Sequence, residues 1–118
     1  MRAMSYRTYG GPLELVDVER PTPKADQVLI RARHSSVNPI DWKMASGKLR
    51  FLIPVKLPAI PGFDVAGEVA EVGPGVTAFR VGDRVHARVL GGSGAASAEF
   101  VLAGLDVVAP VPARRAYI

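Results

Sequence analysis

A glycine-rich stretch, residues 91–97, has the spacing that most invites a cofactor-binding interpretation. Gly92 and Gly94 stand two residues apart, as glycines do in a dinucleotide-binding loop. Such a loop binds a pyrophosphate only where a buried strand leads in and a helix leads out, so that the helix N-terminus meets the phosphates. Residues 97–102 read as a strand instead, and no acidic residue lies about twenty positions further on to bind a ribose. We therefore predict an ordinary loop that binds no phosphate.

Potential metal ligands are present, but they do not stand at the spacing of a metal site. They are His34, Asp64, Glu68 and His86. Neither histidine has a second ligand at metal-binding spacing. His34 falls on the apolar side of a predicted strand, which indicates a hydrogen-bonded core residue, and His86 lies between two arginines whose charges oppose a bound cation. The absence of cysteine excludes thiolate ligands, disulfides and a cysteine nucleophile. We expect no zinc site.

Length and composition are those of one β-rich domain. The chain has 118 residues, 48% of them apolar, so it can bury a core, and its 12 glycines and 10 prolines indicate many turns. The net charge of +4 comes from Lys and Arg residues scattered along the chain, without the basic run typical of nucleic-acid or membrane binding. No stretch resembles a signal peptide or a membrane span. We expect a cytoplasmic protein that binds neither nucleic acid nor membranes.

Short apolar segments bounded by glycine and proline predict the elements that must position any site. The expected strands are residues 1–9, 13–18, 26–36, 63–72, 84–90, 97–102 and 107–111. A short helix is expected over residues 42–45, where Asp41 can cap the N-terminus and Gly47 can end the helix. Residues 48–61 contain Pro54, Pro58 and Pro61 and read as a loop. The pattern predicts a mainly β fold, a partly open β-barrel with one short helix.

Two further segments carry chemistry and, together with three later motifs, resemble a known family. They are residues 37–43 (Val-Asn-Pro-Ile-Asp-Trp-Lys) and residues 61–69 (Pro-Gly-Phe-Asp-Val-Ala-Gly-Glu-Val). The later motifs are, in order, Val-Gly-x-Gly-Val, Phe-x-x-Gly-Asp-Arg-Val and Ala-Glu-Phe-Val. This ordered set resembles the medium-chain dehydrogenase/reductase superfamily, whose N-terminal catalytic domain is GroES-like. The resemblance implies a GroES-like domain over residues 1–112 and an atypical tail over residues 113–118.

Glycines within these motifs suit a structural role. Gly62 and Gly67 fit places where the backbone turns sharply or approaches another backbone closely. The Gly82-Asp83 pair fits a tight turn. We expect these glycines to shape the fold rather than to bind a ligand.

Two positions make the chain similar to a zinc-independent branch of that superfamily. Its alcohol dehydrogenases bind a catalytic zinc through a cysteine and a histidine, whose matching positions here are Asn38 and Phe63. An amide and a phenyl ring are poor zinc ligands, and the alcohol dehydrogenase mechanism needs the metal as a Lewis acid. The chain is therefore similar to quinone oxidoreductases and enone reductases, which transfer a hydride from NADPH to a quinone or an activated alkene.

The same resemblance implies roles for five residues. Asn38 is the first candidate for catalysis and cofactor binding, since its amide can donate to a substrate carbonyl or to the cofactor's amide or ribose; alternatively it satisfies the turn. Asp41 is a second catalytic candidate or else a helix cap. Lys43 stands where many quinone oxidoreductases have a tyrosine, and it either donates to developing enolate charge or is solvated. Trp42 and Phe63 either wall a flat aromatic substrate or belong to the core.

In complete members of the superfamily, which are often homodimers, a Rossmann domain follows and binds most of the NADPH. The sequence has no counterpart of that domain before Ile118, so we expect the chain to be incomplete for catalysis. Two functions fit. We favour the substrate-side domain of an oxidoreductase that acts on a small quinone or enone, because the Asn-Pro-Ile-Asp turn is present. The alternative is a free-standing GroES-like binding module without redox chemistry.

Overall fold

The computed structural model describes residues 1–36, 39–48, 51–52, 56–89 and 95–112, whose strands form two antiparallel sheets. The smaller sheet pairs β1 (Arg2–Ser5) with β2 (Glu14–Asp17). The larger has the strand order β6-β3-β4-β5-β7. Its strands are β3 (Gln27–Ser35), β4 (Asp64–Val72), β5 (Arg84–Arg88), β6 (Phe100–Gly104) and β7 (Val108–Pro110). The helices of the described residues are α1 (Pro39–Ala45) and the 3-10 turn η1 (Leu105–Val107).

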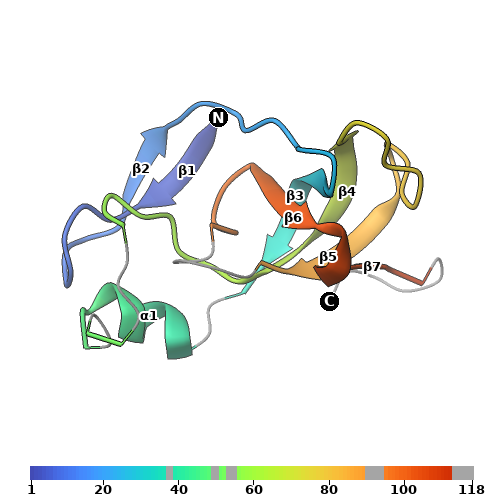
Figure 1. Ribbon diagram of the computed structural model, residues 1–118. Coiled ribbons are helices and arrows are strands. Elements are labelled where there is room, and N and C mark those ends of the chain that lie inside the picture. Colours follow the sequence, from blue (N-terminus) through green and yellow to red (C-terminus); the bar gives the residue numbers. More distant parts are fainter. Residues whose placement is uncertain (37–38, 49–50, 53–55, 90–94, 113–118) are drawn as a thin grey trace.

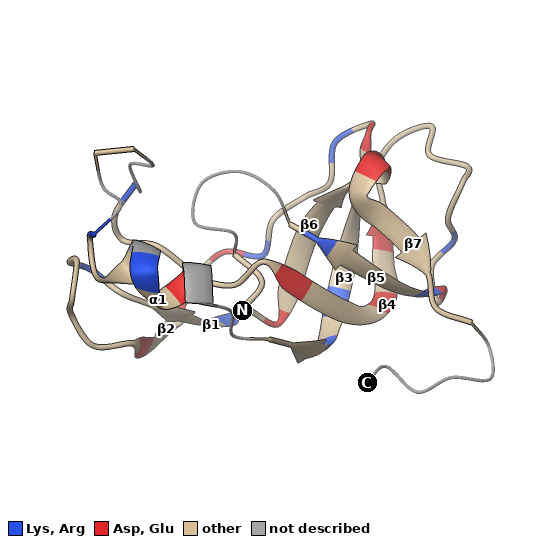
Figure 2. Ribbon diagram, turned by 90° about the horizontal axis from the view of Figure 1, so that it is seen from below, with Lys and Arg blue, Asp and Glu red and all other residues tan. Residues whose placement is uncertain are grey.

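The larger sheet curls into a half-barrel, and the smaller sheet lies at the other end of the molecule (Figure 1). The helix α1 lies beside the β1–β2 hairpin in both views (Figures 1 and 2). Basic and acidic residues are interspersed along the ribbon in the view from below (Figure 2). The mainly β, partly open barrel with one short helix is therefore confirmed. None of the helices in the described ranges is long and apolar enough to cross a membrane.

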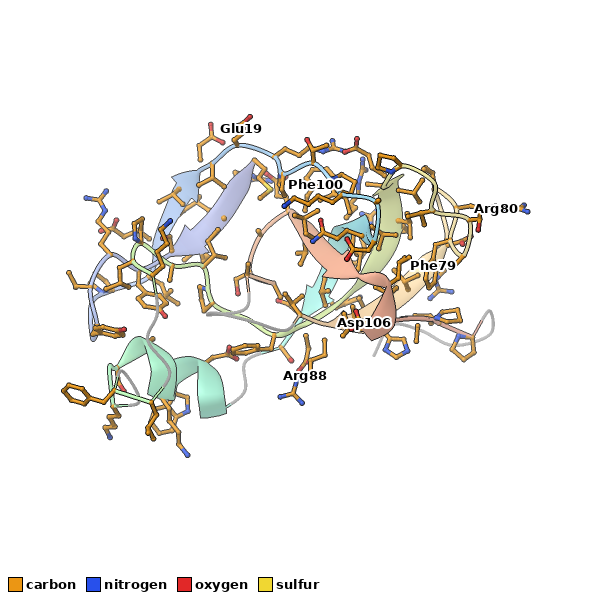
Figure 3. The ribbon with its side chains drawn as sticks, viewed as in Figure 1. Glu19, Phe79, Arg80, Arg88, Phe100 and Asp106 are labelled. Atoms are coloured by element: carbon orange, nitrogen blue, oxygen red, sulfur yellow. The ribbon has the colours of Figure 1, made fainter. Side chains whose placement is uncertain are left out.

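The core follows the two-residue alternation of the strands. Its buried members are Val28, Ile30, Val65, Val69, Val85, Ala87, Val89, Ala96, Val101 and Ala103. Val85 and Ala87 point inward from β5, whereas His86 and Arg88 are exposed, as predicted. Phe79 packs against this core, while Arg88 extends away from the ribbon (Figure 3). Burial of each large aliphatic side chain contributes about 1.5–3 kcal/mol to stability.

His34 is exposed, so the prediction of a core histidine is wrong. Ala32 pairs with Gly67 on β4, but His34 already pairs with Ala66, so β3 holds one extra residue at this point. Such a β-bulge breaks the alternation and moves the following side chains to the opposite face of the sheet. His34 therefore leaves the core face that its spacing from Ala32 assigns to it.

The helix α1 begins earlier than predicted. It starts at Pro39, which makes Asp41 its third residue rather than its N-cap. Proline is favoured in the first turn because no intrahelical partner is needed for its missing N–H. The predicted end is confirmed, since Gly47 follows the helix with a φ of +83°, and the amide of Gly10 donates to the Ala45 carbonyl oxygen at 2.7 Å.

The last strands also differ from the predicted ranges. The predicted strand over residues 107–111 consists of the end of η1 followed by β7. Pro110 is accommodated because β7 forms an edge of the larger sheet. Residues 48–61 are not wholly a loop, since the amide and carbonyl of Ala59 bond to Tyr6 at 3.0 and 2.9 Å.

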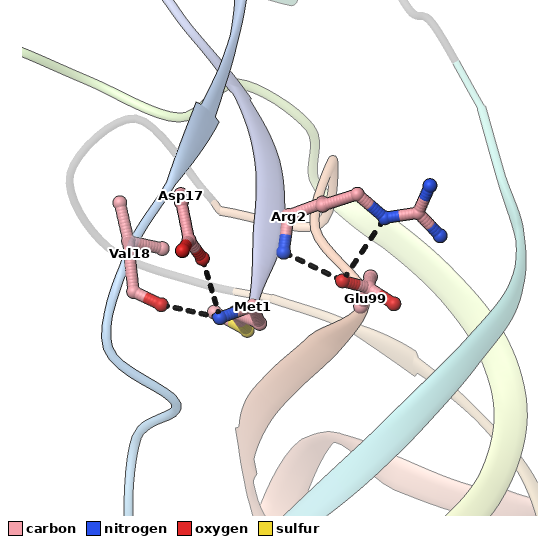
Figure 4. A network of polar contacts seen from close by, with 5 residues as sticks. All are labelled: Met1, Arg2, Asp17, Val18 and Glu99. Carbon is pink, nitrogen blue, oxygen red and sulfur yellow. Dashed lines mark hydrogen bonds and ion pairs between the residues drawn. The ribbon is translucent and has the colours of Figure 1, made fainter.

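Polar contacts at the N-terminus attach the smaller sheet to the segment before β6 (Figure 4). The Arg2 amide donates to Glu99 Oε1 at 2.6 Å and its Nε donates at 3.4 Å. These hydrogen bonds lower the pKa of the Glu99 carboxyl below its ordinary value. The terminal ammonium of Met1 contacts Asp17 Oδ1 at 3.0 Å and the Val18 carbonyl. The Met1–Asp17 pair is exposed at Asp17 and adds little to stability.

Gly67→Ala should destabilise the domain by about 1–3 kcal/mol. A Cβ at Gly67 would lie 1.9 Å from the Arg31 carbonyl oxygen of the paired strand, so the backbone must shift. Urea unfolding followed by circular dichroism measures the change. Gly104→Ala is the matched control, because Gly104 also lies in a strand, its φ is −70°, and a methyl there would meet the end of the Asp106 side chain rather than backbone. Unchanged stability of Gly67→Ala would show that the strands do not approach so closely.

Candidate functional site

A small pocket forms where four segments that are distant in the sequence meet. It has a volume of about 140 Å³ and lies between α1, the β1–β2 hairpin, the turn before β4 and the loop before β6. Its apolar wall consists of Tyr6, Leu13, Trp42, Ala45 and Pro61. Polar groups also line it, from Ser36, Asp41 and Ser97. Two of the predicted site residues, Asp41 and Trp42, therefore belong to one pocket.

Asp41 joins the two segments that resemble the dehydrogenase/reductase superfamily. Its side chain is buried, with 7% of the residue exposed. Asp41 Oδ1 accepts a hydrogen bond from the Gly62 amide at 3.1 Å. Gly62 has a φ of +106°, and a Cβ there would contact Ser97 and Ala96 within 3.1 Å, so the turn that presents this amide requires glycine. The predicted structural role of Gly62 is confirmed.

Tyr6 is a buried site residue that sequence reasoning missed. It is 1% exposed and lines the pocket with Asp41. Burial raises the pKa of the Tyr6 hydroxyl above its ordinary value of 10.0, and the nearby charges of Tyr9 and Asp41 raise it further. An aromatic residue near the end of an N-terminal strand carries no motif, so only the three-dimensional contact with α1 identifies it.

Trp42 lies at the mouth of the pocket and is 53% exposed. The ammonium groups of Lys43 and Lys48 lie 5.8 and 5.9 Å from the centre of its ring. Exposed cation–π contacts at this distance contribute about 0.5–1 kcal/mol at most. Lys43 itself is exposed and does not line the pocket, and its role as a donor stays a prediction.

Phe63 and Asn38 are not among the described residues that line this pocket. Phe63 is buried, with 9% exposed, and its carbonyl accepts a hydrogen bond from the Val89 amide. Because its side chain does not reach the pocket wall, its role as a substrate wall stays a prediction. Asn38, one residue before α1, lies outside the described residues, and its role also stays a prediction.

Neither a metal cluster nor a phosphate loop is found in the parts of the chain that are described. No three His, Asp or Glu side chains come together there as a cation site. Residues 91–94 of the glycine-rich stretch lie outside the described ranges. Beyond them, the amides of Ala95 and Ala96 both donate to the Gly62 carbonyl, and the chain continues into β6 without a helix.

Comparison with known proteins identifies the family. The profile of the alcohol dehydrogenase GroES-like domain matches residues 24–113. The chloroplast envelope quinone oxidoreductase homolog of Arabidopsis thaliana is 48% identical over 108 residues, covering 87% of this chain and 32% of that protein. Quinone oxidoreductase of Mus musculus is 41% identical over 117 residues, covering 95% and 34%. The chain belongs to the alcohol dehydrogenase GroES-like domain family, and its relatives include quinone oxidoreductases of the medium-chain dehydrogenase/reductase superfamily.

A solved structure agrees with this assignment. Quinone oxidoreductase of Escherichia coli, in complex with NADPH, superimposes with a TM-score of 0.87 at 26% sequence identity. The match covers 99% of this chain and 35% of that protein. The chain thus spans about a third of the length of the relatives it matches.

Tyr6→Phe should make the free energy of unfolding less dependent on pH above 10.0. The pKa of Tyr6 is raised on folding, so between the ordinary pKa of 10.0 and the folded pKa the native state keeps a proton that the unfolded state has released. The unfolding free energy should therefore fall as the pH rises above 10.0, by up to about 1.4 kcal/mol per pH unit. Urea unfolding at neutral and alkaline pH tests this. Equal alkaline slopes for wild type and Tyr6→Phe would contradict it.

Proposed function

We propose that this chain is the substrate-side domain of an NADPH-dependent oxidoreductase that reduces quinones or activated alkenes without zinc. The observation that carries the proposal is the hydrogen bond from Gly62 to Asp41, because it joins the two segments that resemble the medium-chain dehydrogenase/reductase superfamily. The quinone oxidoreductases among the relatives support the substrate class. The NADPH complex of the Escherichia coli enzyme supports the cofactor.

Binding of NADPH rests mainly on a second domain. A dinucleotide pyrophosphate is held by a glycine-rich turn that opens a helix. In the described residues the α-helix is α1, which has seven residues and follows Val37 and Asn38 rather than glycines. This domain thus does not fit the phosphates. In the complete enzyme NADPH supplies the hydride, and this domain holds the acceptor.

Asn38 acts on the acceptor in this proposal. Negative charge develops on the carbonyl oxygen of a quinone or enone as the molecule is reduced, and a donor aimed at that oxygen stabilises the transition state. An amide supplies such a donor without titrating. Asp41, three residues later, holds the start of α1 against the turn at Gly62. Asp41 is thus a positioning residue, and Lys43 is the next donor if Asn38 fails.

Asn38→Ala should lower the turnover number by about ten- to a thousandfold, the usual effect of losing one donor to developing charge. Phe63→Leu should mainly raise the Michaelis constant, because an apolar wall binds ground and transition states about equally. Steady-state kinetics with a quinone and an enone test both, on a fusion that supplies a cofactor domain after Pro112.

Unfolding midpoints control for misfolding in both variants. Full turnover by a folded Asn38→Ala enzyme would return Asn38 to a structural role and make Lys43→Met the next variant to measure. If both Asn38→Ala and Phe63→Leu have wild-type kinetics, the proposal that this domain acts on the substrate is wrong.

The purified protein should hold far less than one zinc per chain, because Asn38 and Phe63 occupy the positions of two zinc ligands in the alcohol dehydrogenases it resembles. Metal analysis after incubation with zinc and dialysis measures this, with a zinc-containing alcohol dehydrogenase of the superfamily treated in parallel. One tightly held zinc per chain would overturn the zinc-independent assignment.

A further inference from the structure

We propose that another pocket, on the solvent side of the larger sheet, binds the phosphate group of a small phosphate monoester through three arginine side chains. This pocket lies beside residues 68–70, in the second half of β4, whereas the turn at Gly62 precedes the start of that strand. The proposal goes beyond the redox function, since binding here needs neither Asn38 nor a cofactor domain.

The pocket combines basic side chains with an apolar rim. The basic side chains that define this arginine pocket are Arg20, Arg31 and Arg33. Val81, which is 66% exposed, and Gly82 line it from the turn before β5. Its volume is about 280 Å³, close to the lower limit of about 300 Å³ for pockets that bind small molecules. The pocket therefore suits one small anionic group with a short organic substituent.

Two of the arginines are held in place by contacts within the protein. Nη2 of Arg20 donates to Glu71 Oε2 at 2.9 Å, and its Cζ lies 4.0 Å from the centre of the Phe100 ring. Phe100 is the first residue of β6 (Figure 3). Nε of Arg33 donates to both carboxylate oxygens of Glu68, at 2.9 and 3.2 Å. Side chains that are already ordered lose less conformational entropy when a ligand binds.

Arg31 supplies the positive charge that attracts an anion. Its side chain is exposed, and its Cζ lies 5.6 Å from the centre of the Phe100 ring. In the part of the chain that the structure describes, no carboxylate pairs with it, because Glu68 and Glu71 pair with the other two arginines. Three guanidinium groups thus face two carboxylates, which leaves an excess of one positive charge. The five N–H donors of Arg31 are available to a ligand.

The chemistry of this pocket favours a phosphate group over a carboxylate. A phosphate monoester carries about 1.5–2 negative charges at pH 7 and three acceptor oxygens, so it can bind more than one guanidinium group at once. Guanidinium groups form bidentate, charge-assisted hydrogen bonds with phosphate. A carboxylate has a single charge and two oxygens in one plane. The organic part of the ester can cover Val81, which removes apolar surface from water.

Phenyl phosphate is the probe, added to the isotopically labelled chain and followed by nuclear magnetic resonance in about 0.1 M salt. The Gly82 amide resonance should shift saturably, because this residue lines the pocket. We expect a dissociation constant on the order of 1 mM, typical of so small a ligand. Benzoate, which keeps the ring but has one charge, should bind about tenfold more weakly. Inorganic phosphate lacks the ring and should bind a few-fold more weakly than the ester.

Variants separate a built site from diffuse attraction to a basic protein. Arg31→Gln should weaken binding of phenyl phosphate at least about tenfold. Arg88→Gln is the matched control, since Arg88 is also an exposed strand residue of the larger sheet but does not line the pocket (Figure 3). Arg88 pairs with Asp64, four residues before Glu68. That separation is roughly 13 Å along β4, more than the Debye length of about 10 Å in 0.1 M salt, so Arg88→Gln should bind as wild type.

Unfolding midpoints show whether each variant is folded. Should Arg31→Gln not fold, Arg20→Gln takes its place, because Arg20 lies outside the strands. Equal affinities of the arginine-pocket variant and Arg88→Gln would reduce the binding to attraction by the net charge of +4 and overturn the proposal. Benzoate or inorganic phosphate binding as tightly as phenyl phosphate would show that the ligand is not a phosphate monoester. Quinone reduction is tested separately, by the variants at positions 38 and 63.

Discussion

The hydrogen bond from the Gly62 amide to the Asp41 carboxylate is the contact on which the arrangement of the site depends. It is buried, and it joins residues that are 21 positions apart in the chain. A charged acceptor makes such a bond worth about 1.5–3 kcal/mol, more than a neutral hydrogen bond. It fixes a helix of only seven residues, too short to be stable alone, against the turn that begins β4.

The curvature of the larger sheet depends on a second constraint, the close approach of β3 and β4. Gly67 has no side chain where the Arg31 carbonyl comes nearest, and the bulge between Ala32 and His34 follows directly. A bulge bends its strand and increases the local twist. The strand then leaves the sheet toward Ser36, which lies in the pocket wall and hydrogen-bonds Asp64 at 2.9 Å. The bulge and the hydrogen bond from Ser36 to Asp64 thus place the end of β3 beside the pocket.

Local patterns predicted most of the fold, because alternation and turn residues are properties of neighbours in the chain. The inward face of β5, with Val85 and Ala87, is such a case. His34 shows the limit, since one bulged residue reverses the alternation and nothing in the sequence marks the bulge. The contact of Asp41 with Gly62 is equally invisible, because both residues have good local explanations as a cap and a turn. Tyr6 reaches the site only through tertiary packing.

The hydrogen bond between Asp41 and Gly62 also places few demands on the side chains beside it. The donor is a backbone amide, so the bond constrains the position of residue 63 without constraining its side chain. Position 38 precedes α1 and position 63 follows Gly62, so the two positions at which we propose that this chain differs from zinc-binding members lie on either side of the bonded pair. Neither side chain is the donor or the acceptor of the bond, so we expect a change at either position to leave the bond intact. The proposed change of reaction at these two positions would then leave the placement of α1 the same.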